Sequence, residues 1–133
     1  MRAVLLDTHV WAWSLTGDPR LSSNSRDAIS QASGVYVSSI SFFEIGQKVR
    51  VGKWPEMQPL LGRLEDLLKE QGGKICLPDP KISLLAAAME WAHRDPFDRI
   101  IVASAIQNGL ALISADTAFD TLTSDSQWFG RIW

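Results

Sequence analysis

The sequence predicts an α/β fold, a three-layer α/β/α sandwich with a mainly parallel central sheet. Short, uninterrupted apolar runs such as 3–6 and 110–113 are typical of strands that are buried on both faces of a sheet. Segments with helical start and stop signals separate these runs, and strands that alternate with helices favour parallel pairing. The 133 residues contain no internal repeat and no linker, so we expect a single domain over 1–133.

The first part of the chain opens with the apolar strand 3–6, after which Asp7-Thr8 can cap a helix. The breaker Gly17-Asp18-Pro19 ends that helix, and Ser22 opens a second one that Gly34 is expected to stop. Residues 35–37, a β-branched and aromatic run, predict the second strand.

The middle of the chain is expected to contain two helices. Serines at 38–41 can cap the first, which runs from about Phe42 to Val51. The second covers 56–71, because its leucines share one face and its charges lie opposite. Lys74–Leu77 then predicts a third strand.

The last part of the chain contains one strong start signal, Asp95 as N-cap followed by Pro96. It opens a helix that runs to Gln107 and ends at Asn108-Gly109. The other elements expected here are a helix at 82–91, a strand at 110–113, a short helix from residue 116 and a weak terminal strand near 131–133.

Composition excludes several classes of protein. With 13 Lys and Arg against 15 Asp and Glu, the net charge is −2, so the chain does not hold nucleic acid by bulk positive charge alone. The single cysteine, Cys76, excludes an internal disulfide, and with only His9 and His93 beside it a structural zinc site is not expected. We find neither a membrane span nor a signal peptide, and we expect a cytoplasmic protein.

Four acidic residues recur where predicted strands end or helices begin: Asp7, Glu44, Asp98 and Asp116. Ligands of open α/β sheets bind beyond the carboxyl ends of the strands, so these side chains are expected to converge there. Carboxylates in one place repel each other unless a cation is present, and hard oxygen ligands select Mg²⁺ or Mn²⁺. Such an ion beside a phosphodiester activates a water, so the pattern indicates a metal-dependent phosphodiesterase.

Each acid also has an ordinary structural interpretation. Asp7 and Asp116 could simply cap helices, and Glu44 stands four residues before Lys48, the favourable order for a surface ion pair. Asp98 fits the helix dipole and lies three residues after Asp95, close to a capping-box spacing. Asp95 could itself be only a cap or could join the site.

Three segments resemble the signature segments of PIN domains, most closely the VapC toxins of bacterial toxin–antitoxin pairs: 5–11, 37–45 and 93–105. The match continues in order through Gly52-Lys53-Trp54 and through 112–116 with Phe119. It covers nearly the whole chain, and the segment with Asp95 and Asp98 is the most specific. Phe43 stands where this subfamily often has Trp.

The resemblance implies a PIN-like endoribonuclease that uses Mg²⁺ or Mn²⁺, forms a homodimer and is blocked by a small antitoxin. It places the catalytic and metal-ligand roles on Asp7, Glu44, Asp98 and Asp116. Thr8 and Ser114 fall at positions that support the site in this family.

Basic and aromatic residues are further candidates. Lys48, Arg50 and Lys53 with Trp54 could bind phosphates and stack on unpaired bases, or form a solvated helix face. Arg94 and Arg99 could hold RNA phosphate or pair locally. We interpret both histidines as packing or supporting groups, because metal-activated water needs no general base.

Two alternatives differ in class from the ribonuclease. One is a non-catalytic PIN-like nucleic-acid-binding module, which has no need of four mutually repelling acids. The other is a metal-dependent DNA nuclease, because the sequence does not identify the sugar of the substrate.

Overall fold

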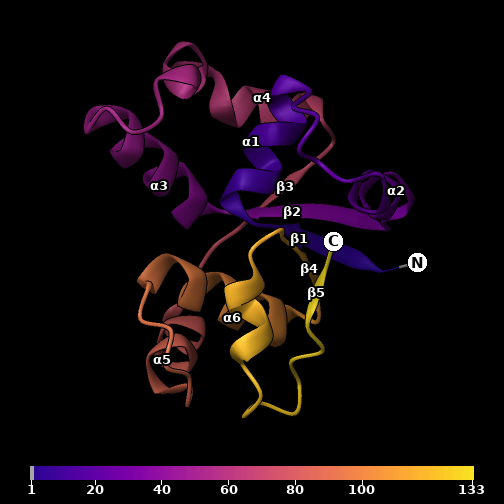
Figure 1. Cartoon of the computed structure of the whole chain (residues 1–133), viewed down its shortest axis with the longest axis vertical. Helices are drawn as coiled ribbons and strands as arrows, with labels where there is room; N and C mark the ends of the chain where they lie inside the picture. Colours follow the sequence, from indigo (N-terminus) through magenta and orange to yellow (C-terminus); the bar gives the residue numbers. More distant parts are fainter. Residues whose placement is uncertain (1) are drawn as a thin grey trace.

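The computed structural model describes residues 2–133 and contains one sheet of five parallel strands in the order β3-β2-β1-β4-β5. Helices cover both faces of this sheet, so the expected three-layer α/β/α sandwich is confirmed (Figure 1). The strands are β1 (Ala3–Leu6), β2 (Gly34–Ser38), β3 (Lys74–Cys76), β4 (Ala111–Ile113) and β5 (Arg131–Ile132).

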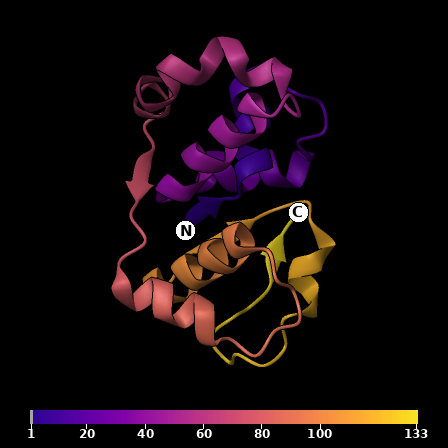
Figure 2. The same ribbon diagram turned by 90° about the vertical axis from the view of Figure 1, so that its left-hand side faces the viewer.

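The helices form two groups, one on each side of the sheet (Figures 1 and 2). The first group is α1 (Thr8–Thr16), α2 (Ser23–Gln31), α3 (Ser39–Arg50), the 3-10 helix η1 (Pro55–Arg63) and α4 (Leu64–Glu70). The second is α5 (Pro80–Ala88), α6 (Pro96–Asn108) and the 3-10 helix η2 (Thr117–Thr121). None of the helices in residues 2–133 is long and apolar enough to cross a membrane.

The central strands are buried on both faces, as their continuous apolar runs indicated. In β1, Val4 and Leu6 pack in the core on the α1 side, whereas Leu5 packs in the core on the α6 side. In β4, Ile113 packs in the core on the α1 side and Leu112 in the core on the α6 side. Alternate side chains of one strand therefore join the two helical layers through the sheet.

The direction of the chain through the sheet creates a crevice beside β1. From β1 the chain proceeds outward to β2 and β3, whereas β4 and β5 lie on the other side of β1. The β1–β4 pairing continues past the strand, because the Asp7 amide donates to the Ile113 carbonyl at 3.1 Å. Ligands of open α/β sheets bind at such a reversal of strand order, at the carboxyl ends of the strands.

Three predicted elements differ from the structure. The second helix ends at Gln31, and Gly34 begins β2 instead of stopping the helix. The single helix expected over 56–71 is divided into a 3-10 helix at 55–63 and α4, and Pro59, which has no amide to donate, lies in the part that is not α-helical. The helix expected over 82–91 is α5, which starts at Pro80 because the Asp79 side chain accepts from the Ile82 amide at 2.8 Å.

The strong start signal at residues 95–96 is confirmed. Asp95 is the N-cap of α6 and accepts a hydrogen bond from the Phe97 amide at 2.9 Å. The predicted end is also correct within one residue, because α6 closes at Asn108 and Gly109 adopts the left-handed conformation with φ of 62°.

Candidate metal centre

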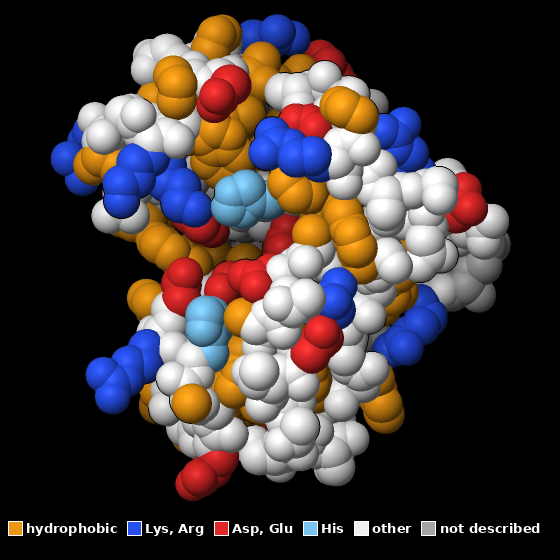
Figure 3. Space-filling view, viewed as in Figure 1, with side chains coloured by type: hydrophobic (Ala, Val, Ile, Leu, Met, Phe, Trp, Pro, Cys, Tyr) orange, Lys and Arg blue, Asp and Glu red, His pale blue; other side chains and the backbone are white. Residues whose placement is uncertain are grey.

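A cavity of about 480 Å³ opens at the carboxyl edge of the sheet, and acidic side chains from four segments of the chain line it. Figure 3 shows the hollow as a patch of Asp and Glu side chains between the two helical layers. The lining carboxylates are Asp7, Glu44, Asp95, Asp98 and Asp116. The structure therefore brings the four predicted acids to one place and adds Asp95 to them.

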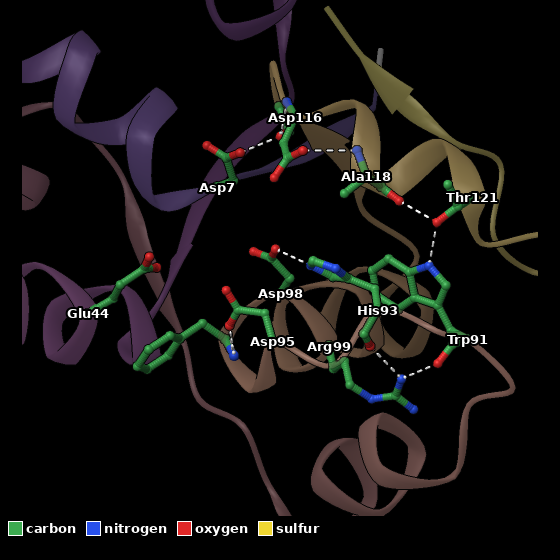
Figure 4. A network of polar contacts seen from close by, with 12 residues as sticks. Asp7, Glu44, Trp91, His93, Asp95, Asp98, Arg99, Asp116, Ala118 and Thr121 are labelled. Carbon is green, nitrogen blue, oxygen red and sulfur yellow. Dashed lines mark hydrogen bonds and ion pairs between the residues drawn. The ribbon is translucent and has the colours of Figure 1, made fainter.

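Asp7 and Asp116 are connected through Ser114. Asp7 is the N-cap of α1, where one of its oxygens accepts from the Val10 amide at 2.8 Å. Its other oxygen accepts a short hydrogen bond from the Ser114 hydroxyl, which in turn accepts from the Asp116 amide at 3.0 Å. One hydroxyl thus aligns the ends of β1 and β4, and Figure 4 shows Asp7 and Asp116 close together there.

Glu44 enters the cavity from α3 and is buried. Its carboxylate forms an ion pair of 2.7 Å with Lys48, four residues along the same helix, and Lys48 also lines the cavity. The ion-pair interpretation and the site interpretation are therefore both compatible with this position. Beneath it, the buried Thr8 hydroxyl donates to the Ser41 hydroxyl at 2.8 Å and so joins α1 to α3.

Asp98 lies in the first turn of α6 and contacts His93, with 2.7 Å between Asp98 Oδ2 and His93 Nε2 (Figure 4). His93 belongs to the loop before the helix, five residues away, so helical periodicity did not predict the pair. Ligand atoms of His93, Asp95 and Asp98 all lie within 4.8 Å of one another. Among residues 2–133 this is the tightest grouping of potential metal ligands. It shares only Asp98 with the four predicted acids.

Arg99 has a structural position that the sequence did not reveal. Its guanidinium donates to the carbonyls of Ala86, Met89, Trp91 and His93 at 2.6–2.9 Å. These bonds hold the loop between α5 and α6, which carries His93 towards Asp98. Of the two roles considered for Arg99, these contacts are local pairing, and they use four of its five N–H groups. Its assignment to RNA binding stays a prediction.

The remaining basic candidates are dispersed. Lys48 lines the acidic cavity, and Lys53 lines a neighbouring one. Arg50 and Arg94 are exposed and line neither of these two cavities. Their assignment to RNA binding stays a prediction.

Burial shifts the acid–base behaviour of the two central carboxyl groups. Burial raises the pKa of Asp7 to about 6, although its hydrogen bonds from Ser114 and Val10 oppose the rise. Burial likewise raises the pKa of Asp98 to about 6, against the lowering effect of His93. Each pKa is also raised by neighbouring acids, so ionising the cluster costs more than ionising the same groups in water, and a bound cation would offset that cost.

These donors fit a hard divalent cation. The cavity offers carboxylate oxygens, which Mg²⁺ and Mn²⁺ prefer, and the raised pKa values of Asp7 and Asp98 show that ionisation there lacks compensation. Asp7, Asp98 and Asp116 are the residues placed to hold such an ion, together with Glu44, of which Lys48 contacts one oxygen. Their roles as ligands stay a prediction.

Comparisons with known proteins identify the family and agree with the fold. The model of the PIN domain family matches residues 4–124. Ribonuclease VapC22 from Mycobacterium tuberculosis (strain ATCC 25618 / H37Rv) is 32% identical over 117 residues, 87% of this chain and 88% of the relative. The DNA-bound VapBC structure from Salmonella typhimurium has a TM-score of 0.69 at 19% identity, over 93% of this chain and 95% of that one. VapBC2 from Rickettsia felis, bound to a DNA fragment from its promoter, has a TM-score of 0.66 at 16% identity, over 92% and 94%.

Proposed function

Because this chain belongs to the PIN domain family, we propose that it is a metal-dependent endoribonuclease and the toxin of a toxin–antitoxin pair. The observation that carries the proposal is the acidic cavity. Five carboxylates line it, and two of them, Asp7 and Asp98, have pKa values raised to about 6 by burial. A binding module has no use for such an arrangement, whereas a cation-dependent hydrolase requires one.

A bound Mg²⁺ or Mn²⁺ supplies Lewis-acid chemistry, since it lowers the pKa of a water and stabilises charge on a phosphodiester. The protein's part is to position the ligands. Ser114 fixes the orientation of Asp7 and the backbone at Asp116, and His93 fixes Asp98. Lys48 stands beside Glu44 at the mouth of the cavity, where its ammonium can meet a phosphate of the substrate.

Cleavage of RNA is the direct test of the proposal. Total RNA is incubated with the antitoxin-free protein in Mg²⁺, with and without EDTA, and the new ends are mapped. We expect cleavage that EDTA stops and that Asp98→Asn abolishes. The control is Asp27→Asn, which removes an exposed acid on α2 that lines neither this cavity nor its neighbour.

The same experiment separates the alternatives. Retention of RNA without any cut would favour a binding module, and EDTA-sensitive cleavage of single-stranded DNA but not RNA would favour a DNA nuclease. Cleavage that persists in EDTA would contradict the assignment of the acidic cavity as a metal site.

Two partners belong to the proposal. A small antitoxin is expected to co-purify when the neighbouring reading frames are expressed together, and to inhibit the cleavage. A homodimer is also expected, and light scattering of the purified protein tests it.

A further inference from the structure

A second cavity of about 580 Å³ adjoins the acidic one. The residues that line both cavities include His9, Trp13, Arg20 and Lys48. Trp54 and Lys53 line only the second cavity, which we call the aromatic cleft. The two cavities therefore share a wall of four side chains, and a ligand that contacts this wall lies at the border of both.

Aromatic rings and cations are paired in the aromatic cleft. The Trp54 ring stacks on His9 with centroids 4.7 Å apart and planes inclined by 26°. Lys48 Nζ lies 5.6 Å from the centroid of Trp54. The Arg20 guanidinium lies 5.0 Å from the centroid of Trp13, where an ion pair of 2.8 Å with Asp18 holds it.

The rings of the cleft differ from those of the core. Trp11 is fully buried, as expected for packing, whereas Trp13 and Trp54 are half-buried and His9 is exposed. All three rings line the cleft, where His9 and Trp54 stack on each other and Arg20 and Lys48 lie over Trp13 and Trp54. The part of each ring that is still exposed faces the cleft. Half-buried rings interleaved with cations are the usual surface for unpaired nucleotides, whose bases stack while their phosphates meet the cations.

Lys48 connects this surface to the acidic cavity. The same ammonium that approaches the Trp54 ring lies 2.7 Å from Glu44. A nucleotide whose phosphate enters the acidic cavity thus has its neighbouring base close to the rings. Lys53, exposed at the rim, is placed for the next phosphate along the strand.

We propose that the aromatic cleft binds one unpaired RNA base next to the phosphodiester that is cut. Trp54 is the residue that determines at which position of the strand the base must be unpaired. The inference rests on the proposed ribonuclease function and specifies its substrate as single-stranded at that base. Stacking on an aromatic side chain is tolerant of base identity, so the cleft selects for an unpaired base more than for one sequence.

The test is a double-mutant cycle in which one change removes a side chain of the protein and the other removes a base of the RNA. Binding of a fluorescent single-stranded oligoribonucleotide of about six nucleotides is measured by anisotropy in an Asp98→Asn background, which spares the probe. In a series of probes, one position at a time lacks its base. The protein is compared with Trp54→Leu and with Trp54→Phe, which keeps a ring.

We expect Trp54→Leu to weaken binding of the intact probe between about fivefold and a hundredfold, and Trp54→Phe to restore part of the loss. At one position of the probe, removal of the base should lower the affinity of the parent protein by a similar factor. The same removal should not lower the affinity of Trp54→Leu any further. The matched control is Trp128→Leu, because Trp128 is also half-buried but packs near Phe119, outside both cavities.

Two results would overturn the inference. One is that every abasic probe loses as much affinity in Trp54→Leu as in the parent. The other is that Trp54→Leu binds RNA as tightly as Trp128→Leu does. This result counts against the inference even if Trp54→Leu no longer binds a protein partner. If Trp54→Leu does not fold, Trp54→Met, which also lacks a ring, carries the same comparison. Since the readout is binding, failure of the parent to cut RNA would refute the proposed function separately.

Discussion

Replacing Asp98 with Asn should make the metal-free protein more stable at neutral pH. Asp98 is largely buried in the acidic cavity, and burial is the main cause of its raised pKa. Asn has the same shape and can still contact His93, but it carries no charge that burial penalises. The substitution therefore removes an electrostatic cost and leaves the start of α6, which Asp95 caps, in place.

The size of the gain follows from the pKa. A rise from 3.8 to about 6 is about two units, and each unit corresponds to about 1.4 kcal/mol of unfolding free energy. The upper limit is thus about 3 kcal/mol. Some of it is lost because a neutral amide bonds His93 less strongly than a carboxylate does, so we expect about 1–3 kcal/mol. In a chain of this size that is a rise in Tm of about 4–12 °C.

The sign of the pH dependence distinguishes this explanation from others. Since the pKa of Asp98 is higher in the folded state than the ordinary 3.8, the folded protein holds more protons between pH 3.8 and about 6. Its stability falls as pH rises through that window, and the full cost is present above it. The advantage of Asp98→Asn should therefore be complete at neutral pH and absent below the ordinary pKa of an aspartate.

The assay is thermal or urea unfolding in EDTA across this pH range, with Asp27→Asn as the exposed control. Added Mg²⁺ should stabilise the parent, by about 2.7 kcal/mol at a hundredfold excess over its Kd, and should stabilise Asp98→Asn much less. A loss of stability in Asp98→Asn at neutral pH would refute the reasoning, because it would mean that the carboxylate supports the helix start instead of burdening the fold.

Three further substitutions have defined outcomes. Ser114→Ala removes the hydroxyl between the two strand ends, so it should cost about 1–3 kcal/mol and raise the pKa of Asp7 further, seen as an alkaline shift in the pH profile of RNA cleavage. Lys48→Met leaves the buried Glu44 without its cation, so the metal-free protein should lose about 1–3 kcal/mol in thermal unfolding, while Mg²⁺ raises the Tm by more than in the parent. Arg99→Lys cannot reach all four carbonyls, so it should cost about 2–4 kcal/mol in urea unfolding and lower cleavage by releasing the loop.

Two of these substitutions have a matched control, and the third has an outcome that would contradict it. Arg94→Lys, on the same segment but exposed, should change stability by less than about 0.5 kcal/mol. Ser126→Ala removes an exposed hydroxyl that lines neither cavity, so it should leave the pH profile unchanged. If Lys48→Met gains no more from Mg²⁺ than the parent does, the ammonium does not compete with the ion for Glu44.

The strands and the start of α6 were predictable because their signals are local. The local sequence is enough to predict a strand from an apolar run such as 3–6 or a helix start from an Asp-Pro pair such as 95–96. The four acids were predictable as a group because strand order brings the ends of β1 and β4 together. The contacts of His93 and Arg99 were not, since both depend on how the irregular loop after α5 folds back on α6. Pattern reasoning also overlooked Asp79-Pro80, although it is the same cap signal that succeeded at 95–96.

Three of the five acids in the cavity also cap helices, with one oxygen on a backbone amide: Asp7 on Val10, Asp95 on Phe97 and Asp116 on Ala118. These carboxylates are therefore built into the frame of the fold before any ion arrives. In a zinc finger the metal is needed for folding, so the metal-free protein is unfolded and metal binding cannot be measured apart from folding. Here the empty protein should be a folded reference state. Ion affinity, ion number and the competition between Mg²⁺ and Mn²⁺ can then be measured by simple titration, with no folding transition mixed into the curve.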